Sequence, residues 1–166
     1  MKTLILDNFL SKEECKFLIE YYESNTENIE KFRDVFPLTL HFVEKLNFLT
    51  FKLNKIAEEF DAQIDWFQIV KWPKNSFQEL HFDTAKKETV LSSIVYLNDN
   101  FEGGQTYFEE GTMFKPKKGR GLFFDGQYYK HGVTPVKKQI RYVVATWYKK
   151  IKSNPSILHP LLQMQY

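Results

Sequence analysis

The stretch VLSSIVYLNDNFEGGQTYF, from Val90 to Phe108, indicates the fold most clearly. Its β-branched and apolar beginning is typical of a buried strand, and the run from Asn98 to Gly104 is rich in turn-forming residues. A second short strand is expected at Thr106-Tyr107-Phe108. Similar short strands, separated by turns that contain Gly or Pro, are expected from about residue 61 to residue 149. This pattern predicts a double-sheet barrel or sandwich.

The chain before this region is predicted to be mainly helical, after a short strand at Thr3–Leu6. Ser11 and Glu14 have the spacing of a capping box, and an apolar stripe at helical spacing follows them. A second helix is predicted from about Thr39 to Phe60, and Pro37 is expected to end the polar segment before it. We therefore predict one domain with three parts: a helical front (1–60), a β core (about 61–150) and an irregular tail (151–166).

Charge, cysteine content and hydropathy limit which binding partners and which cellular compartment we expect for this protein. The formal net charge of the 166 residues is only +2, so electrostatics give no reason to expect nucleic acid as a partner. The single cysteine, Cys15, excludes an internal disulfide and is expected to be a small buried hydrophobe. No apolar run approaches the roughly 18 residues that span a bilayer, and the first residues do not resemble a signal peptide. We expect a soluble, cytoplasmic protein without a membrane partner.

The pattern His81-Phe82-Asp83, followed much later by His131, suggests a metal site. Side chains at i and i+2 project from the same side of a strand, and a distant His on a neighbouring strand could complete the set. Two imidazoles and one carboxylate can bind one face of an Fe(II) ion and leave the opposite face open. Taken singly, the His-x-Asp pair is more often a surface strand without metal, and His131 alone could be a structural His near a turn.

Arg141 adds a candidate anion site. In the last predicted strand, Arg141, Val143 and Trp147 share one face, while Tyr142 and Val144 share the other. If the Arg141 face looks inward, a buried guanidinium must be paired, and a bound carboxylate could pair it through two parallel hydrogen bonds. An internal salt bridge with a protein carboxylate is an equal alternative at this point. Tyr96 could donate to the same bound carboxylate, or it could simply pack in the core.

Four segments, taken together and in this order, are similar to those of a known family. They are HFD (81–83), YLNDNFEGGQTYF (96–108), PKKGRGLFF (116–124), and HGVTPV (131–136) followed by Arg141 and Trp147. The chain resembles the small Fe(II)- and 2-oxoglutarate-dependent dioxygenases of the prolyl 4-hydroxylase type. The resemblance covers nearly the whole chain apart from the tail and the stretch from Asn25 to Pro37. One departure is that relatives often have a Tyr-x-x-Gly segment where Trp72-Pro73-Lys74-Asn75 stands here.

The resemblance implies a mainly β, double-stranded β-helix (jelly-roll, cupin-like) fold with helices bracing one outer side. It implies a metal site formed by His81, Asp83 and His131, and a cosubstrate whose distal carboxylate is held by Arg141 with Tyr96. Thr106 and Trp147 are further candidates for cofactor binding. The implied cofactors are Fe(II), 2-oxoglutarate and O₂, and a requirement for ascorbate stays open.

The implied reaction releases succinate and CO₂ and hydroxylates an aliphatic C–H, with a prolyl residue of a peptide or protein as the first expectation. The same chemistry on a free amino acid, another small molecule or a modified base is the main alternative. The third reading is a non-catalytic metal-binding jelly-roll protein. Candidate elements of the substrate rim are the turn at Lys74–Gln78, the loop at Thr84–Glu88 and the segment Asn25–Phe36.

Overall fold

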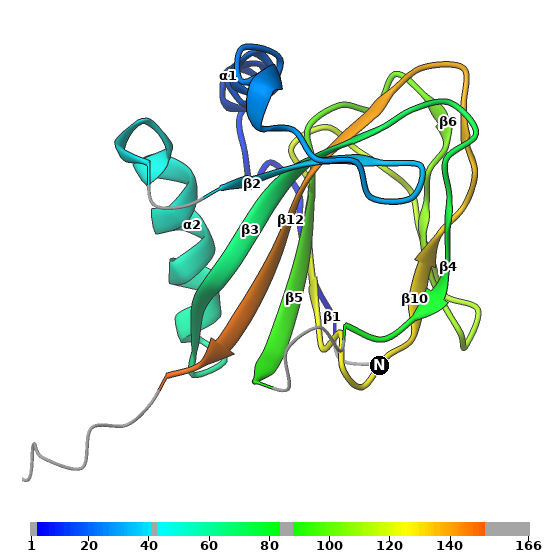
Figure 1. The fold of residues 1–166 in the computed structure, drawn as a ribbon. Coiled ribbons are helices and arrows are strands. Elements are labelled where there is room, and N and C mark those ends of the chain that lie inside the picture. The colour runs from blue at the N-terminus through cyan, green and yellow to red at the C-terminus, as the bar shows by residue number, and fades with distance from the viewer. Residues whose placement is uncertain (1–2, 41–42, 84–87, 152–166) are drawn as a thin grey trace, which may run out of the picture.

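The computed structural model describes residues 3–40, 43–83 and 88–151, and two antiparallel sheets that face each other dominate this part of the chain (Figure 1). The larger sheet has the order β1 (Thr3–Leu6), β9 (Gly121–Phe124), β5 (Thr89–Tyr96), β12 (Arg141–Lys150), β3 (Ala62–Trp72), β2 (Phe36–Leu40). The smaller sheet has the order β4 (Gln78–His81), β10 (His131–Val133), β7 (Thr106–Phe108), β8 (Met113–Phe114). A short pair, β6 (Glu102–Gly103) and β11 (Val136–Lys137), lies beside them. This mainly β architecture agrees with the predicted jelly-roll.

The two α-helices of the described residues, α1 (Lys12–Glu23) and α2 (Asn47–Glu58), lie on the outer side of the larger sheet (Figure 1). Single 3-10 turns, η1 (Thr26–Asn28) and η2 (Glu44–Leu46), occur in the connections. The predicted capping box starts α1: the Ser11 side chain accepts a hydrogen bond from the Glu14 backbone N–H, and the Glu14 carboxylate accepts one from the Ser11 N–H. Leu18 and Leu53 are completely buried between the helices and the sheet.

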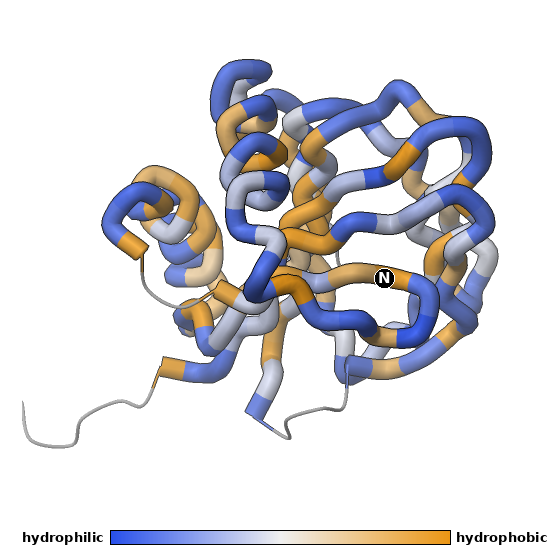
Figure 2. Tube along the Cα trace, turned by 45° about the horizontal axis from the view of Figure 1, so that its top comes forward, coloured by the Kyte–Doolittle hydropathy of each residue, from blue (hydrophilic) through white to orange (hydrophobic). Residues whose placement is uncertain are grey.

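Strand β12 divides its side chains between the two faces of the larger sheet. Tyr142 and Val144 pack in the core cluster beneath the helices, whereas Val143 and Ala145 belong to a second cluster between the sheets. Arg141 is in register with Trp72 of β3, and both residues line the space between the sheets. Hydrophobic residues follow these central strands and hydrophilic ones follow many of the outer loops (Figure 2). The face of β12 that carries Arg141 therefore faces the space between the two sheets.

The second predicted helix is wrong at its beginning. Residues Phe36–Leu40 form β2, which contains Pro37, and α2 begins only at Asn47. Proline lacks a backbone N–H, but β2 lies at the edge of the larger sheet, where a missing donor is tolerated. Leu38 and Leu40 are buried there, so tertiary packing decides this segment. His41 and Phe42, which the prediction placed on the helix, lie outside the described residues.

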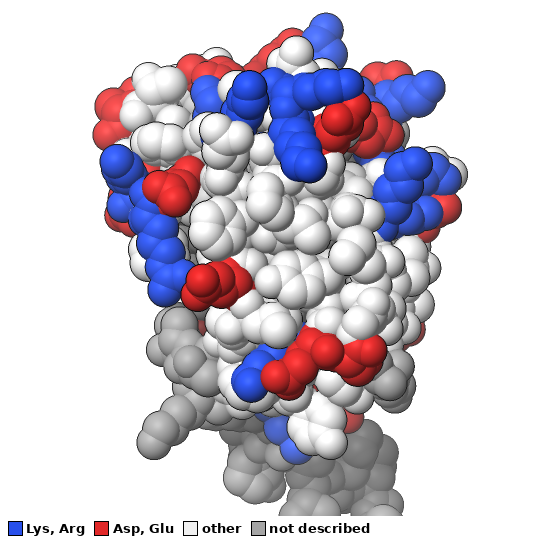
Figure 3. Space-filling view, turned by 90° about the vertical axis from the view of Figure 1, so that its right-hand side faces the viewer, with Lys and Arg blue, Asp and Glu red and all other residues white. Residues whose placement is uncertain are grey.

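The outer face of the smaller sheet carries Leu80 and Met113, which are 38% and 50% exposed. Figure 3 shows that the centre of this side of the molecule has few charged side chains, while Lys, Arg, Asp and Glu gather at its borders. Among the helices that the structure describes, none has the length and apolar character needed to cross a membrane. The predicted tail, apart from Ile151, lies outside the described residues.

Candidate active site

Three residues that the sequence singled out meet at one end of the space between the sheets. His81 ends β4 and His131 begins β10, and the two are direct register partners across the antiparallel pair. Asp83 follows β4 by two residues, and one of its oxygens, Oδ1, lies 3.6 Å from Nε2 of each histidine. One potential ligand atom from each residue lies within 4.8 Å of the others. A single ion can therefore contact all three side chains.

The backbone fixes which nitrogen of each imidazole faces this point. Nδ1 of His81 lies 2.9 Å from the Glu79 carbonyl oxygen, and Nδ1 of His131 lies 3.1 Å from that of Tyr129. A carbonyl oxygen only accepts hydrogen bonds, so both Nδ1 atoms carry the proton in these contacts. The lone pair of each Nε2 is then directed toward Asp83 and is free for a metal ion.

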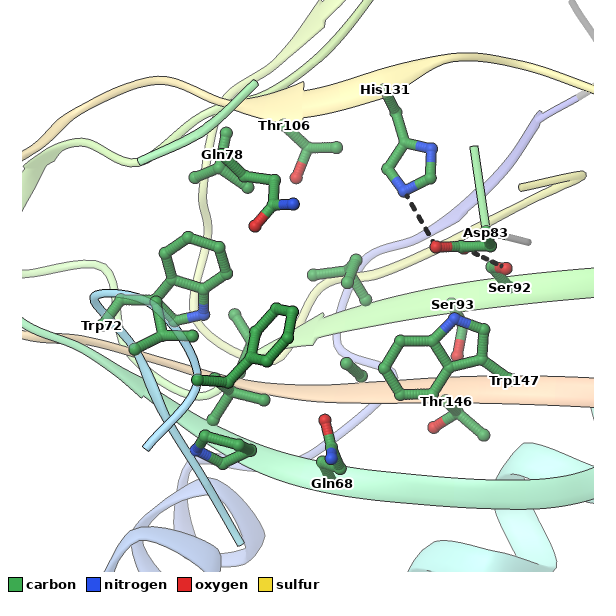
Figure 4. Close-up of a pocket in the computed structure, with 18 of the residues that line it drawn as sticks. Gln68, Trp72, Gln78, Asp83, Ser92, Ser93, Thr106, His131, Thr146 and Trp147 are labelled. Atoms are coloured by element: carbon green, nitrogen blue, oxygen red, sulfur yellow. Dashed lines mark hydrogen bonds and ion pairs between the residues drawn. The ribbon is translucent and has the colours of Figure 1, made fainter. Parts of the chain in front are cut away.

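Asp83 is held by two residues that sequence reasoning did not find. The Ser92 hydroxyl donates a 2.6 Å hydrogen bond to Oδ2 of Asp83, so Oδ1 is left facing the histidines (Figure 4). The Asp83 backbone N–H donates to the Gly126 carbonyl oxygen at 2.8 Å. A Cβ at residue 126 would lie only 2.3 Å from Oδ2 of Asp83 and 2.4 Å from the Ser92 hydroxyl. A larger residue at this position would therefore have to displace the side chains of Asp83 and Ser92.

The pKa shifts of Asp83 and His131 favour the protonation states that bind a metal, whereas the pKa shift of His81 favours its protonated form, so a bound metal would have to displace that proton. Burial alone would raise the pKa of Asp83, but the hydrogen bond with His81, the charge of His131 and the hydrogen bond from Ser92 outweigh it and lower that pKa. Burial lowers the pKa of His131. Burial also disfavours a charged His81, but the Asp83 carboxylate and the Glu79 carbonyl raise the pKa of His81 above its usual value. An ionised carboxylate and neutral imidazoles are the forms that coordinate metals.

The three residues line a cavity of about 580 Å³ that extends between the two sheets. Arg141 lies in the same cavity and is completely buried. None of its three side-chain nitrogens has a hydrogen-bond partner among the described residues. Burial lowers the pKa of Arg141, because a charged guanidinium loses its solvation there, and the nearby Tyr96 only partly opposes this effect. An internal salt bridge, the alternative considered from the sequence, does not occur in the described part of the chain.

The surroundings of Arg141 form a small polar end of the cavity. Its guanidinium carbon lies 4.8 Å from the centre of the Trp72 ring and 5.4 Å from that of Tyr96. The Tyr96 hydroxyl is 2.7 Å from the Thr106 hydroxyl, so one of the two O–H groups is used between them. The other O–H remains able to donate to a ligand. This set of donors suits an anion.

Trp147 lies at the end of the cavity that contains Asp83, on the side of the larger sheet (Figure 4). Its ring stacks on that of Trp66, with centroids 3.9 Å apart and an angle of 8° between the planes. A hydrogen bond from its indole contributes to the low pKa of Asp83. Trp147 therefore lies beside Asp83 (Figure 4), whereas the Thr106 hydroxyl contacts that of Tyr96, whose ring lies next to the Arg141 guanidinium.

Exposed residues of a hairpin that precedes β2 border the cavity and form its mouth. Phe32 and Val35 exchange two backbone hydrogen bonds of 3.0 Å, and Arg33 in the turn has a positive φ of 53°. Phe32, Arg33 and Glu30 all line the cavity. Of the predicted rim elements, this part of Asn25–Phe36 and Gln78 contribute to the lining, while residues 84–87 lie outside the described residues.

The donor set fits the cofactors of one enzyme class. Two imidazoles and one carboxylate on one side of an ion suit Fe(II) with open positions for other ligands. An unpaired, buried cation in the same cavity suits the far carboxylate of a dicarboxylic acid whose other end reaches the metal. These two requirements are met within a single cavity.

Comparison with known proteins agrees with this geometry. A family model described as the 2OG-Fe(II) oxygenase superfamily matches residues 67–149, where 2OG denotes 2-oxoglutarate. No curated protein sequence matches the chain closely enough to count as a relative.

Several solved structures share the fold. A viral collagen prolyl hydroxylase from Paramecium Bursaria Chlorella virus-1, in complex with 2OG, is 23% identical with a TM-score of 0.70, and the alignment covers 92% of this chain and 97% of that chain. A Pseudomonas putida prolyl-4-hydroxylase is 17% identical with a TM-score of 0.69, covering 90% and 92%. A Trichoplax adhaerens prolyl hydroxylase, in complex with a peptide fragment of the hypoxia inducible factor oxygen degradation domain, is 17% identical with a TM-score of 0.75, covering 89% and 83%. At these identities the likeness concerns the fold, and it confirms the predicted jelly-roll.

The family match is more specific, because it spans half of the chain and contains His81, Asp83, His131 and Arg141. The chain that brings these four residues into one cavity thus belongs to the 2OG-Fe(II) oxygenase superfamily and is a 2-oxoglutarate-dependent dioxygenase.

Proposed function

We propose that this protein hydroxylates an aliphatic C–H of a prolyl residue in a peptide or protein, with His81, Asp83 and His131 as the Fe(II) ligands and Arg141 as the anchor of 2-oxoglutarate. The observation that carries the proposal is the pairing, within one cavity, of the three-donor cluster with a buried guanidinium that has no partner in the described chain. A scaffold protein needs neither open coordination positions nor an unpaired buried cation.

Iron with 2-oxoglutarate and O₂ supplies the oxidising power, converting 2-oxoglutarate into succinate and CO₂ as the substrate C–H is hydroxylated. The protein positions these reagents. Ser92 holds Oδ2 of Asp83, so that Oδ1 is presented to the metal. Arg141 would hold the distal carboxylate of 2-oxoglutarate, and the free O–H of the Tyr96–Thr106 pair would be available to donate to the same carboxylate.

The wall between the two ends of the cavity keeps water away from the reacting atoms. Val70, Val143 and Ala145 line this part and are buried. The stacked pair of Trp66 and Trp147 adds a broad aromatic surface next to Asp83. An apolar, enclosed site strengthens every electrostatic contact within it and limits side reactions of the oxidant.

A peptide substrate is supported by the mouth of the cavity. Phe32 on the hairpin is 55% exposed, and the guanidinium carbon of Arg33 lies 5.3 Å from the centre of its ring. Phe82, which lies between His81 and Asp83 in the sequence, is a second exposed aromatic residue that lines the cavity. An extended chain could pass between these groups and place an apolar prolyl ring against the aromatic wall. The Trichoplax adhaerens protein, which has a similar fold, was solved with a peptide fragment.

The test is succinate release by the Fe(II)-loaded protein in the presence of 2-oxoglutarate and O₂, with and without ascorbate. Proline-rich peptides should stimulate release, and mass spectrometry should locate one added oxygen on a prolyl residue. If free amino acids or modified bases stimulate succinate release and peptides do not, the proposed substrate is wrong, but the proposed reaction type stands. Metal binding without succinate release under any condition would support the non-catalytic alternative.

A further inference from the structure

One buried polar group in the cavity has no role in the reaction as proposed above. Trp72, the last residue of β3, is 8% exposed and lines the cavity. Its indole nitrogen is buried and has no hydrogen-bond partner among the described residues. The ring projects into the cavity, on the same side as Gln78 and Thr106 (Figure 4).

Such a group is costly in a protein interior. An indole N–H is a donor only, and a buried donor without an acceptor loses its hydration without compensation. Native proteins rarely leave such groups unpaired, so each one calls for an explanation, and a functional role is one of them. Trp72 is also the direct register neighbour of Arg141, whose nitrogens are unpaired in the same way. Two neighbouring side chains thus present unsatisfied N–H groups at one end of one cavity.

We propose that the indole N–H of Trp72 donates a hydrogen bond to a carboxylate oxygen of the 2-oxo acid that Arg141 holds. The inference rests on the proposed function, because it takes that acid as the ligand of Arg141. Arg141 supplies the charge, and Trp72 adds a neutral, directional donor whose ring also packs 4.8 Å from the guanidinium carbon. Together they define where the carboxylate lies and which acids fit beside the ring.

The alternative is that Trp72 serves only as an aromatic support for the guanidinium. Replacing Trp72 by Phe separates the two ideas, because Phe keeps a ring at this position but removes the N–H. In the free protein the lost donor had no partner, so the Trp72→Phe variant should melt at a temperature close to that of the wild type. In the complex a hydrogen bond to a charged acceptor is lost, so the dissociation constant for 2-oxoglutarate should rise at least about tenfold.

The measurement is a calorimetric titration of 2-oxoglutarate into full-length protein loaded with Mn(II), which holds the cosubstrate without turnover. The ligand-dependent rise in melting temperature is recorded for the same samples. Trp72→Tyr is the matched partner of Trp72→Phe, since the two differ by one hydroxyl group. The proposal predicts that Tyr, which restores a donor, recovers part of the affinity that Phe loses.

Equal 2-oxoglutarate affinity of the wild type and Trp72→Phe would overturn the proposal. An equal loss of this affinity in Trp72→Phe and Trp72→Tyr would overturn it too. Arg141→Leu keeps this result separate from the proposed function. If Arg141→Leu abolishes binding while Trp72→Phe does not weaken it, Arg141 remains the anchor and only the role of Trp72 is wrong. If the wild-type protein itself binds no 2-oxoglutarate, both proposals are wrong.

Discussion

The contact between Gly126 and Asp83 gives the sharpest prediction about the proposed metal site. A Cβ at residue 126 would lie 2.3 Å from Oδ2 of Asp83, whereas real Cβ contacts stay beyond 3.0 Å. The carboxylate must then move by at least about 0.7 Å, the difference between the two distances. The same Cβ would lie 2.4 Å from the hydroxyl of Ser92, which holds that oxygen. The Gly126→Ala variant therefore displaces both the proposed ligand and its support.

A displaced carboxylate should weaken metal binding more than folding. Loss of the groups that orient a metal ligand typically lowers affinity about 10- to 100-fold, and we expect an effect in this range for Gly126→Ala. Overpacking of the site should cost about 1–3 kcal/mol of folding free energy. Calorimetric titration of Mn(II) gives the first quantity, and denaturant unfolding of the metal-free protein gives the second.

Gly111→Ala is the control. A Cβ at this position would meet nothing within 4 Å, but the φ of +96° strains any side chain, so this variant loses stability away from the cavity. It should bind Mn(II) as tightly as the wild type. If Gly126→Ala binds Mn(II) with wild-type affinity, or if Gly111→Ala loses as much Mn(II) affinity as Gly126→Ala, the reasoning that Gly126 positions Asp83 is refuted.

Three further predictions concern other residues. Ser92→Ala leaves Oδ2 of Asp83 without its 2.6 Å hydrogen bond, so Mn(II) affinity measured by calorimetry should fall about tenfold or more, and an unchanged affinity would contradict this role. Arg33→Ala removes an exposed charge at the mouth, so KM for a peptide substrate should rise by up to about fivefold with little change in kcat; a selective fall in kcat would argue against a binding role. Leu53→Ala empties a fully buried position between α2 and the sheet, so denaturant unfolding should show a loss of about 2–5 kcal/mol with Mn(II) affinity retained, and a smaller loss would mean that the helix packs loosely.

The sequence allowed the prediction of strands whose side chains divide clearly between the two faces of a sheet. Arg141, Val143 and Trp147 could be placed on one face of β12 because side chains alternate at period two, and that face does line the cavity. The strand at Thr106–Phe108 was predicted with its observed bounds. Such local predictions hold because side chains alternate between the two faces of a strand in the tertiary structure as well.

Features that depend on distant contacts could not be predicted in the same way. Proline in Phe36–Leu40 argued against a strand, and only the position of β2 at a sheet edge, next to β3, makes the strand acceptable. Ser92 lies four residues before Tyr96 in β5, so period two indicates the same face, but its contact with Asp83 depends on how β4 ends. The closeness of Gly126 to Asp83 likewise follows from a backbone hydrogen bond between two loops.

The most direct test of the account is the visible absorption spectrum of the protein with Fe(II) and 2-oxoglutarate in the absence of O₂. If the cosubstrate coordinates an iron held by His81, Asp83 and His131, a weak charge-transfer band should appear on addition of 2-oxoglutarate, and Asp83→Ala should lose it. Arg141→Leu should require a much higher 2-oxoglutarate concentration to produce the same band. A wild-type protein that binds Fe(II) and 2-oxoglutarate without any band, or an unchanged band in Asp83→Ala, would contradict the proposed site.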